Sequence, residues 1–498
     1  MRKGLIAWLL ASLMALCALT GAAAEEPFTL AGFDNTTGRD WTTSQFFEQM
    51  EERTGIAFSL TQYSDAARWA EAKADMVTGN AMPDVLFKAE LSVQETEKLY
   101  QAGKLIDLRP YLEEHAPNLW ALLQEHPAWE KAITLPDGAI VALPMIDTMQ
   151  SNNAMWINRT WLERLHLQMP TTAQELTEVL RAFRDNDPNR NGKQDEKPLS
   201  FIGMWDLRFL GHAFGIISND YYVYADEGGT VREVLTSERQ RAFLEWLHEL
   251  WEENLIDHNG FQLGSQTRQI TDSDATMTYG LMLAPTPLAV VPSGALDQYG
   301  MLMPLSFEGK QVYRDLCGDL VRGAFAVSAA GKNPAAMLEW VDFLYTEEGF
   351  RMAQAGLEGV DYSWYDNGTW GWEMDDQTVA NSVMPRVNMT EGGFMPGLSS
   401  NEFQLAYDQQ QAHEAIVALC DLKQYSVEPY PLVYLTEEEQ ARIDAIQLPL
   451  SSYAEKAMAC FVTGDVALDD QTWKDFCEQV RALGLNEMLG IWQAALTR

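Results

Sequence analysis

A run of oxygen-bearing side chains at residues 187–196 has the spacing of a calcium-binding loop. Oxygen ligands fall at loop positions 1, 3 and 5, and Gly192 at position 6 permits a sharp turn. A hard cation such as Ca²⁺ takes about six to eight oxygen ligands. The predicted ligands are Asp187, Asn189, Asn191, the backbone carbonyl of Lys193, Asp195 and Glu196.

The loop departs from the EF-hand pattern in its last part. An EF-hand carries a bidentate glutamate at position 12, where this chain has Pro198, so Glu196 at position 10 is the natural substitute. The alternative interpretation is a polar turn that binds no ion. If calcium binds, we expect a structural role, because the loop follows a helix and does not need to face a ligand.

Motifs for hydrolytic or phosphate chemistry are missing from the sequence. It contains no H-E-x-x-H, G-x-S-x-G or G-x-x-x-x-G-K-[ST] pattern, and its seven histidines are scattered. The sequence motifs therefore argue against an enzyme.

Strand and helix patterns alternate in the N-terminal part of the chain. Residues 28–33, 56–61 and 83–87 are predicted strands, and residues 41–54 and 69–77 are predicted amphipathic helices. Strands separated by helices imply a mostly parallel sheet with helices on both faces.

The middle of the chain continues this pattern. Residues 140–144 and 154–158 are predicted strands, and the polar stretch 147–153 between them is a predicted crossing between lobes. A helix is expected from Thr172, with Glu175 reaching back in a capping box.

The C-terminal half is predicted to be richer in helix. Helices are expected at 236–253 and 334–345, a strand at 324–327, and an aromatic loop at 361–372. The tail 452–497 is predicted to form helices around a Gly-Asp turn.

The N-terminus has the features of a secretory signal peptide. Basic residues at positions 2 and 3 precede an apolar run and an Ala-x-Ala site, so we expect cleavage after Ala24. A lipid anchor at Cys17 is the less favoured alternative, because the bulky Leu16 precedes it. The mature protein is expected in the periplasm or on the cell surface.

Net charge and cysteine content limit the possible binding partners and disulfide bonds. Loss of Arg2 and Lys3 takes the formal charge from −37 to −39, which disfavours nucleic acid as a partner. The remaining cysteines could pair in three ways or stay as free thiols. They are Cys317, Cys420, Cys460 and Cys477.

Several short patterns together resemble family 1 extracellular solute-binding proteins of ABC importers. They are KADMVTGNAMPDV at 73–85, LPDG at 135–138 with ALP at 142–144, MWINRTWL at 155–162 with PTT at 170–172, and NPAA at 333–336 with YTEEG at 345–349. The tail 461–488 is similar to the large oligosaccharide-binding branch. Related short calcium loops occur in its alginate-oligosaccharide-binding members.

The resemblance implies an α/β, two-lobed periplasmic-binding-protein-like fold of type II, with the ligand in a cleft between lobes. It implies delivery of the ligand, an oligosaccharide, to a membrane permease by a monomeric receptor. The expected division is a signal peptide at 1–24, lobe 1 at 25–147 and 318–358, and lobe 2 at 148–317 and 359–498.

Sugar binding would require aromatic rings against C–H faces and polar groups for hydroxyls. The chain has 16 Trp, 17 Tyr and 20 Phe, most of which are expected in the core. Residues in loops and near the carboxyl ends of strands are the better candidates. The predicted ligand-binding residues are Trp41, Glu90, Trp205, Tyr221, Tyr279, Arg322, Tyr362, Trp370 and Trp372.

Other classes remain as alternatives. The same scaffold could bind a non-carbohydrate solute such as a peptide, because fold alone does not decide the ligand. A secreted glycoside hydrolase would need two paired carboxylates, which sequence alone cannot identify. An adhesin should show internal repeats, and none is visible.

Overall fold

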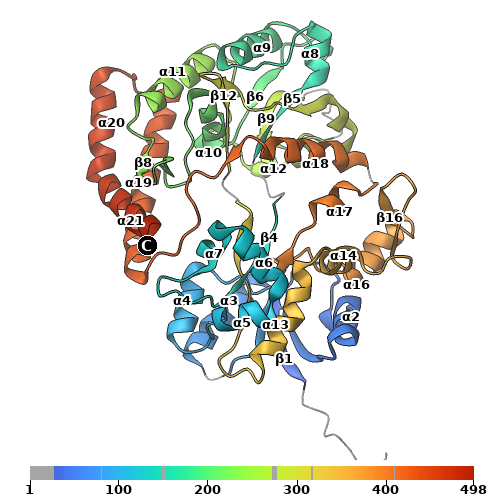
Figure 1. Cartoon of the computed structure of the whole chain (residues 1–498). Coiled ribbons are helices and arrows are strands. Elements are labelled where there is room, and N and C mark those ends of the chain that lie inside the picture. The colour runs from blue at the N-terminus through green and yellow to red at the C-terminus, as the bar shows by residue number, and fades with distance from the viewer. Residues whose placement is uncertain (1–26, 80, 149–152, 272–277, 316–317, 409) are drawn as a thin grey trace, which may run out of the picture.

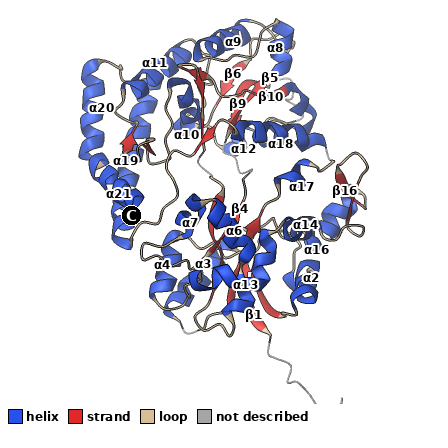
Figure 2. Ribbon diagram, in the orientation of Figure 1, coloured by secondary structure: helices blue, strands red, loops and turns tan. Residues whose placement is uncertain are grey.

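Two lobes, each built around its own β-sheet, make up the chain (Figure 1). Helices flank both sheets, which confirms the predicted α/β two-lobed architecture (Figure 2). The computed structural model describes residues 27–79, 81–148, 153–271, 278–315, 318–408 and 410–498.

The lobe 1 sheet has six strands in the order β17-β4-β14-β3-β1-β2. All strands except β14 run parallel to one another, so their carboxyl ends meet at one edge of the sheet. The strands are β1 (Phe28–Phe33), β2 (Phe58–Tyr63), β3 (Val85–Phe87), β4 (Leu143–Ile146), β14 (Leu320–Val327) and β17 (Gly397–Leu398).

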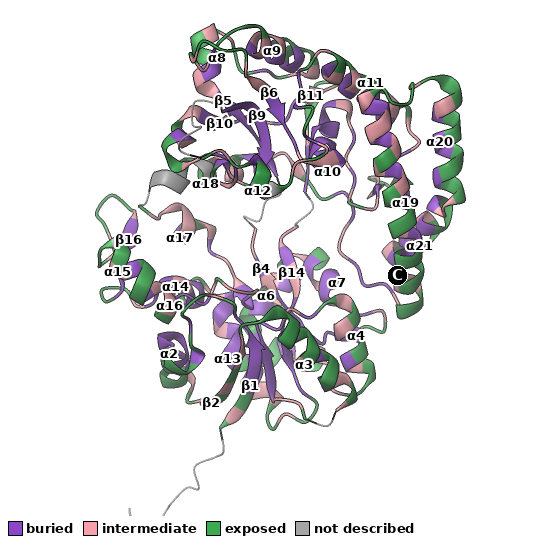
Figure 3. Cartoon of the chain, turned by 180° about the vertical axis from the view of Figure 1, so that it is seen from behind, coloured by how far each residue is buried: buried purple, intermediate pink, exposed green. Residues whose placement is uncertain are grey.

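Alternating side chains of this sheet enter two separate cores. Leu30 and Phe87 pack in one cluster, whereas Phe33 and Leu86 pack in the other. Helices therefore cover both faces, with their outer sides exposed (Figure 3). The lobe 1 helices include α2 (Gln45–Thr54), α3 (Ala66–Thr78), α4 (Val93–Gln101), α5 (Arg109–His115), α6 (Pro117–Glu125), α7 (Pro127–Ile133), α13 (Pro334–Asp342), α14 (Glu347–Ala355), α16 (Met384–Val387) and α17 (Asn401–Leu405).

The lobe 2 sheet has four strands in the order β10-β5-β9-β6. β5 runs antiparallel to β9 and β10, so its amino end lies at the same edge as the carboxyl ends of the other three strands. β5 begins directly after the first crossing from lobe 1, and this edge therefore faces lobe 1. The strands are β5 (Ala154–Asn158), β6 (Lys197–Ser200), β9 (Tyr279–Ala284) and β10 (Tyr299–Met301).

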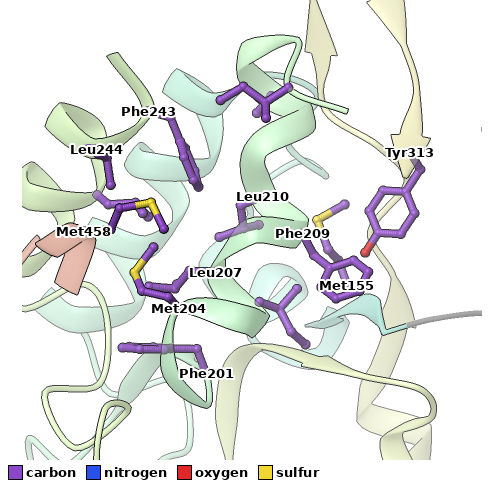
Figure 4. Close-up of a cluster of buried hydrophobic side chains, with 14 of the residues drawn as sticks. Met155, Phe201, Met204, Leu207, Phe209, Leu210, Phe243, Leu244, Tyr313 and Met458 are labelled. Atoms are coloured by element: carbon purple, nitrogen blue, oxygen red, sulfur yellow. The ribbon is translucent and has the colours of Figure 1, made fainter. Parts of the chain in front are cut away.

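A single large core holds lobe 2 together. Met204 and Leu207 point into a cluster with Leu244 and Met458, which joins three helices (Figure 4). The helices include α8 (Arg159–Leu165), α9 (Ala173–Asp185), α10 (Gly203–Leu207), α11 (Glu238–Glu252), α18 (Gln410–Lys423), α19 (Glu437–Thr463), α20 (Asp470–Ala482) and α21 (Leu485–Thr497).

The segment 428–435 bridges the lobes after α18. Tyr434 is buried in a lobe 1 core, whereas Tyr430 is buried in the lobe 2 core and its hydroxyl donates to the carbonyl of Trp492 at 2.7 Å. Arg322 of β14 lies over the Tyr434 ring at 4.7 Å and donates to the carbonyl of Val433. The two tyrosines thus attach one extended segment to both lobes.

The second boundary of lobe 1 differs from the sequence-based expectation. Residues 359–408 were assigned to lobe 2, but β17 pairs with β4 in the lobe 1 sheet. The predicted loop 361–372 is instead a hairpin of β15 (Tyr362–Trp364) and β16 (Trp370–Trp372). The boundary at 358 is therefore wrong, because a two-residue strand far along the chain gives no local sequence signal.

The predicted capping box at α9 forms only in part. Thr172 Oγ1 accepts from the backbone N–H of Glu175, but Glu175 Oε2 accepts from Thr171 and not from Thr172. Cys420, Cys460 and Cys477 are free thiols, and Cys317 lies outside the described residues. Among the described residues, no helix is both long and apolar enough to cross a membrane.

Candidate ligand-binding site and calcium loop

A cavity of about 510 Å³ lies at the carboxyl edge of the lobe 1 sheet. It is the position where ligands bind to open α/β sheets. Four strands supply residues just beyond their ends: Asn35 after β1, Glu90 after β3, Asp147 after β4 and Ser399 after β17. The rest of its lining is Phe33, Met145, Phe350, Gln354, Thr390, Gly392, Gly393, Phe394, Met395, Gly397 and Gln404.

Both polar and apolar groups line this cavity. Glu90, Gln354 and Gln404 offer side-chain oxygens and amides, whereas Phe394 presents a ring that is 42% exposed. An exposed aromatic ring beside several hydrogen-bonding groups suits a ligand with apolar faces and hydroxyl edges.

A buried network of ions lies directly beneath the cavity. Asp34 Oδ2 accepts from Lys88 Nζ at 2.7 Å, from Arg39 Nη1 at 3.2 Å and from Trp41 Nε1 at 3.2 Å. Burial alone would raise the pKa of Asp34, but the attraction of Lys88 and Arg39 holds it below the usual value. Burial lowers the pKa of Lys88 to about 8, against the attraction of Asp34. Lys88 thus remains charged and paired with Asp34 at neutral pH.

The same cations fasten a distant loop over the end of the sheet. Lys88 Nζ donates to the carbonyls of Met389 and Glu391, and Arg39 Nη1 donates to the carbonyl of Glu391. A Cβ on Gly392 would approach Asp34 Oδ1 at 2.2 Å, so only glycine allows this contact. The network therefore positions the loop that carries Phe394.

Glu90 occupies a strained backbone position at the cavity wall. Its φ is +47° and that of Lys88 is +49°, a region that non-glycine residues rarely adopt. Such strain concentrates at functional sites. Burial raises the pKa of Glu90 above its usual value, although Lys73 opposes the shift. The nearby positive charges therefore do not fully offset the cost of burying the Glu90 carboxylate.

Trp205 lies at the lobe 2 edge that faces lobe 1. Its helix α10 directly follows the carboxyl end of β6, and its ring is 42% exposed. The neighbouring Asp206 accepts from Asn153 at 2.6 Å, and Asn153 ends the first crossing. Trp205 is therefore exposed on the side of lobe 2 that faces lobe 1, and its contact with a ligand stays a prediction.

Tyr221 and Arg322 line a second groove, of about 440 Å³, between lobe 2 and α4. Tyr221 packs against Trp492 with ring centroids 5.1 Å apart. The guanidinium of Arg322 is engaged by the bridging segment, as described above. Neither residue lines the cavity that contains Glu90, although the sequence analysis grouped all three in one cleft.

Five predicted cleft aromatics belong to packed clusters. Trp41 is 1% exposed because the polar loop before it turns inward and its indole donates to Asp34. Tyr279 begins β9 at the edge away from lobe 1 and is 9% exposed. Tyr362 and Trp370 form a small hairpin core with Phe403. Trp372 packs beside that core and donates to the Tyr407 hydroxyl.

The calcium loop has a preformed turn. Asp187 Oδ1 and Oδ2 accept from the backbone N–H groups of Asn191 and Gly192 at 3.1 and 3.0 Å. Asn189 and Asn191 both donate to Asp195 Oδ1. The predicted ligands thus converge on one another.

Glu196 provides the test of whether a cation fits. Both of its carboxylate oxygens are shielded from solvent and have no hydrogen-bond partner. Burial raises its pKa, with further contributions from Asp195 and Asp187. Within the described part of the chain no group of three His, Cys, Asp or Glu side chains is placed to hold a metal ion. The amide oxygens of Asn189 and Asn191 accept from the backbone N–H groups of Asn191 and Lys193. Orphaned carboxylate oxygens beside an all-oxygen donor set fit Ca²⁺.

A two-lobed α/β fold with a cavity at the facing strand ends defines a solute-binding protein of the periplasmic-binding-protein-like class. The sequence profile of the bacterial extracellular solute-binding proteins matches residues 34–349. The chain belongs to this family. It is therefore a solute-binding protein and not an enzyme.

Named relatives support this assignment. The chain is 26% identical over 482 residues to the fructooligosaccharide ABC transporter substrate-binding protein FusA of Streptococcus pneumoniae, covering 90% of this chain and 85% of the relative. It is 25% identical over 148 residues to the polygalacturonan/rhamnogalacturonan-binding protein YtcQ of Bacillus subtilis, covering 30% of this chain and 28% of the relative.

Solved structures share the fold. FusA in complex with kestose has a TM-score of 0.69 at 22% identity, over 95% of this chain and 99% of that one. A human-milk-oligosaccharide-binding protein of Bifidobacterium longum infantis has a TM-score of 0.76 at 22% identity over the same shares. Alginate-binding protein AlgQ2 without calcium ion has a TM-score of 0.65 at 19% identity, over 95% and 98%.

Proposed function

We propose that this chain is the extracellular receptor of an ABC importer and captures an oligosaccharide between its lobes. The observation that carries this proposal is the cavity at the carboxyl edge of the lobe 1 sheet, which Glu90, Gln354 and Gln404 line together with the exposed ring of Phe394. Such a lining suits hydroxyls and C–H faces together. A relative that is named for fructooligosaccharides and covers nine-tenths of the chain supports the same ligand class.

Capture proceeds by closure of the lobes about the crossing segments. Among the described residues, lobe 1 consists of 27–147 and 318–408, and lobe 2 of 153–315 and 410–498. Trp205 then approaches the ligand from lobe 2, opposite Phe394. The ligand shifts the population toward the closed form because it contacts both lobes only there.

Export precedes this activity. The signal peptide at residues 1–24 is cleaved after Ala24, and a monomeric receptor delivers its ligand to the membrane permease. Ca²⁺ occupies the loop 187–196 and stabilises lobe 2 at a distance from the sugar. The unpartnered oxygens of Glu196 support this role, as do two related structures, an EF-hand mutant of FusA and AlgQ2 without calcium ion.

A thermal-shift screen of the exported protein tests the proposed ligand class. Fructo-, gluco-, galacto- and manno-oligosaccharides are compared with di- and tripeptides. A rise in melting temperature that grows with the concentration of one sugar series is expected. A response to peptides alone would assign the receptor to a different class of solute.

The Phe394 ring is expected to contribute directly to affinity. Replacement of Phe394 with alanine should weaken binding of the responding sugar by roughly tenfold, or about 1.4 kcal/mol, because an exposed stacking surface is lost. Isothermal titration calorimetry measures this change. Leu448→Ala is the control, since Leu448 is 75% exposed on α19 and lies outside the cavity. Equal affinities for both variants would contradict the site.

Binding should also weaken in acid through Glu90. Only the ionised carboxylate accepts two hydroxyl hydrogen bonds, so affinity falls as pH falls through the pKa of Glu90. Burial raises that pKa, against the charges of Lys73 and Lys88, and the loss therefore begins above the usual glutamate range. Titrations between pH 8 and pH 4 should show this loss in the wild type and a flatter profile in Glu90→Gln.

A further inference from the structure

The charges on the cavity wall are of one sign. Glu90 and Asp147 are the charged residues that line the cavity, and both are acidic. No lysine or arginine side chain among the described residues lines it. Glu90 faces the loop that carries Phe394, and Asp147 lies where the first crossing leaves the sheet.

The nearest cations are already committed to other partners. The side chains of Lys88 and Arg39 are fully buried and share the carboxylate of Asp34. Lys73 is 8% exposed at its side chain and donates to Glu95 and to the carbonyl of Glu90, each at 2.8 Å. None of the three can reach an anion in the cavity without breaking an ion pair, and the pairs of Lys88 and Arg39 are fully buried.

At the facing edge of lobe 2, the exposed side chains of the described residues Trp205 and Leu288 carry no charge. Trp205 is the exposed side chain of α10, and beyond the end of β9 Leu288 is 46% exposed. Arg268 is 6% exposed at its side chain, pairs with Asp206 at 3.1 Å and donates to the carbonyl of Leu283. Closure would therefore cover the ligand with an uncharged surface from these described residues.

We infer that the cleft selects uncharged oligosaccharides and rejects those that carry carboxylates, such as uronates and sialylated chains. This inference rests on the proposed function and names the substrate class of the same site. A sugar carboxylate would lose its hydration and meet Glu90 and Asp147 without a cation to compensate it. Neutral hydroxyls would instead donate to the carboxylate of Glu90.

A matched set of ligands isolates the effect of charge. The neutral oligosaccharide that gives the largest thermal shift is oxidised at one primary hydroxyl to the carboxylate, and a part of that product is converted to its uncharged methyl ester. Titration calorimetry with the full exported protein then gives three affinities. We expect the carboxylate to bind at least roughly thirtyfold more weakly than the ester, and this difference to shrink at high salt.

Two variants test whether the acidic residues of the cavity wall cause the weaker binding of the carboxylate. Glu90→Gln and Asp147→Asn should each bring the ester-to-acid affinity ratio closer to one, by roughly fivefold. Gln354→Ala is the matched control from the same wall, because it changes an uncharged group and should leave the ratio unchanged.

The outcomes separate this inference from the proposed function. Wild-type affinity for the carboxylate equal to or greater than that for the ester would overturn the charge selection and leave the oligosaccharide receptor intact. Short alginate or galacturonate chains that bind more tightly than every neutral sugar would do the same. If no sugar of either class binds, the proposed function fails and the inference falls with it.

Discussion

Replacement of Lys88 with methionine is expected to lower the free energy of unfolding by about 3–5 kcal/mol. The ammonium of Lys88 and the carboxylate of Asp34 are both inaccessible to solvent, and they are 2.7 Å apart. Methionine would keep the apolar volume but leave Asp34 with Arg39 as its one remaining cationic partner, at 3.2 Å. Urea unfolding followed by tryptophan fluorescence gives the loss.

The same variant should also bind sugar poorly. Lys88 holds the carbonyls of Met389 and Glu391, so the loop that carries Phe394 loses its fastening. Arg442→Met is the matched control, because Arg442 forms an exposed ion pair with Glu487 that is worth about 1 kcal/mol or less. Equal stability of the two variants would show that the buried network does not hold this part of lobe 1.

Removal of calcium is expected to lower the melting temperature of the protein. At a calcium concentration a hundredfold above Kd, binding stabilises the folded state by about 2.7 kcal/mol. The orphaned oxygens of Glu196 regain charge compensation only when a cation is present. Differential scanning calorimetry in EDTA, with and without excess Ca²⁺, measures the difference.

Glu196→Gln should abolish most of the calcium-dependent stabilisation. The exposed Glu437, at the start of α19, provides the control in Glu437→Gln, which should respond to calcium as the wild type does. Magnesium should substitute poorly, since it requires a smaller and more regular octahedral site. Identical melting temperatures in EDTA and in Ca²⁺ would show that residues 187–196 form a polar turn that binds no calcium.

Local patterns predicted most of the fold. Strand β1 has the bounds expected from its apolar run, and Pro334 begins α13 as expected. These features depend on a few consecutive residues. β17 could not be predicted in this way, because a strand of two residues has no periodicity and its partner β4 lies some 250 positions earlier in the chain.

Only the part of the candidate site that lies close to predicted strands in the sequence could be predicted. Glu90 was predicted from the rule for open sheets, because it follows a strand whose carboxyl end faces the other lobe. Trp205 was predicted from its position in an irregular segment of lobe 2, and its role stays a prediction. Trp41 also obeys the rule for open sheets but is drawn inward by Asp34, a partner that composition does not reveal. The loop with Phe394 was missed because its anchoring contacts to Lys88 and Arg39 span about 300 and 350 residues.

A crystal structure of the protein with its best neutral oligosaccharide tests the central claim most directly. The account predicts closed lobes, a sugar ring against Phe394, hydroxyls bonded to Glu90, and Trp205 over the opposite face. A sugar held instead in the second groove, which Tyr221 and Arg322 line, would contradict it.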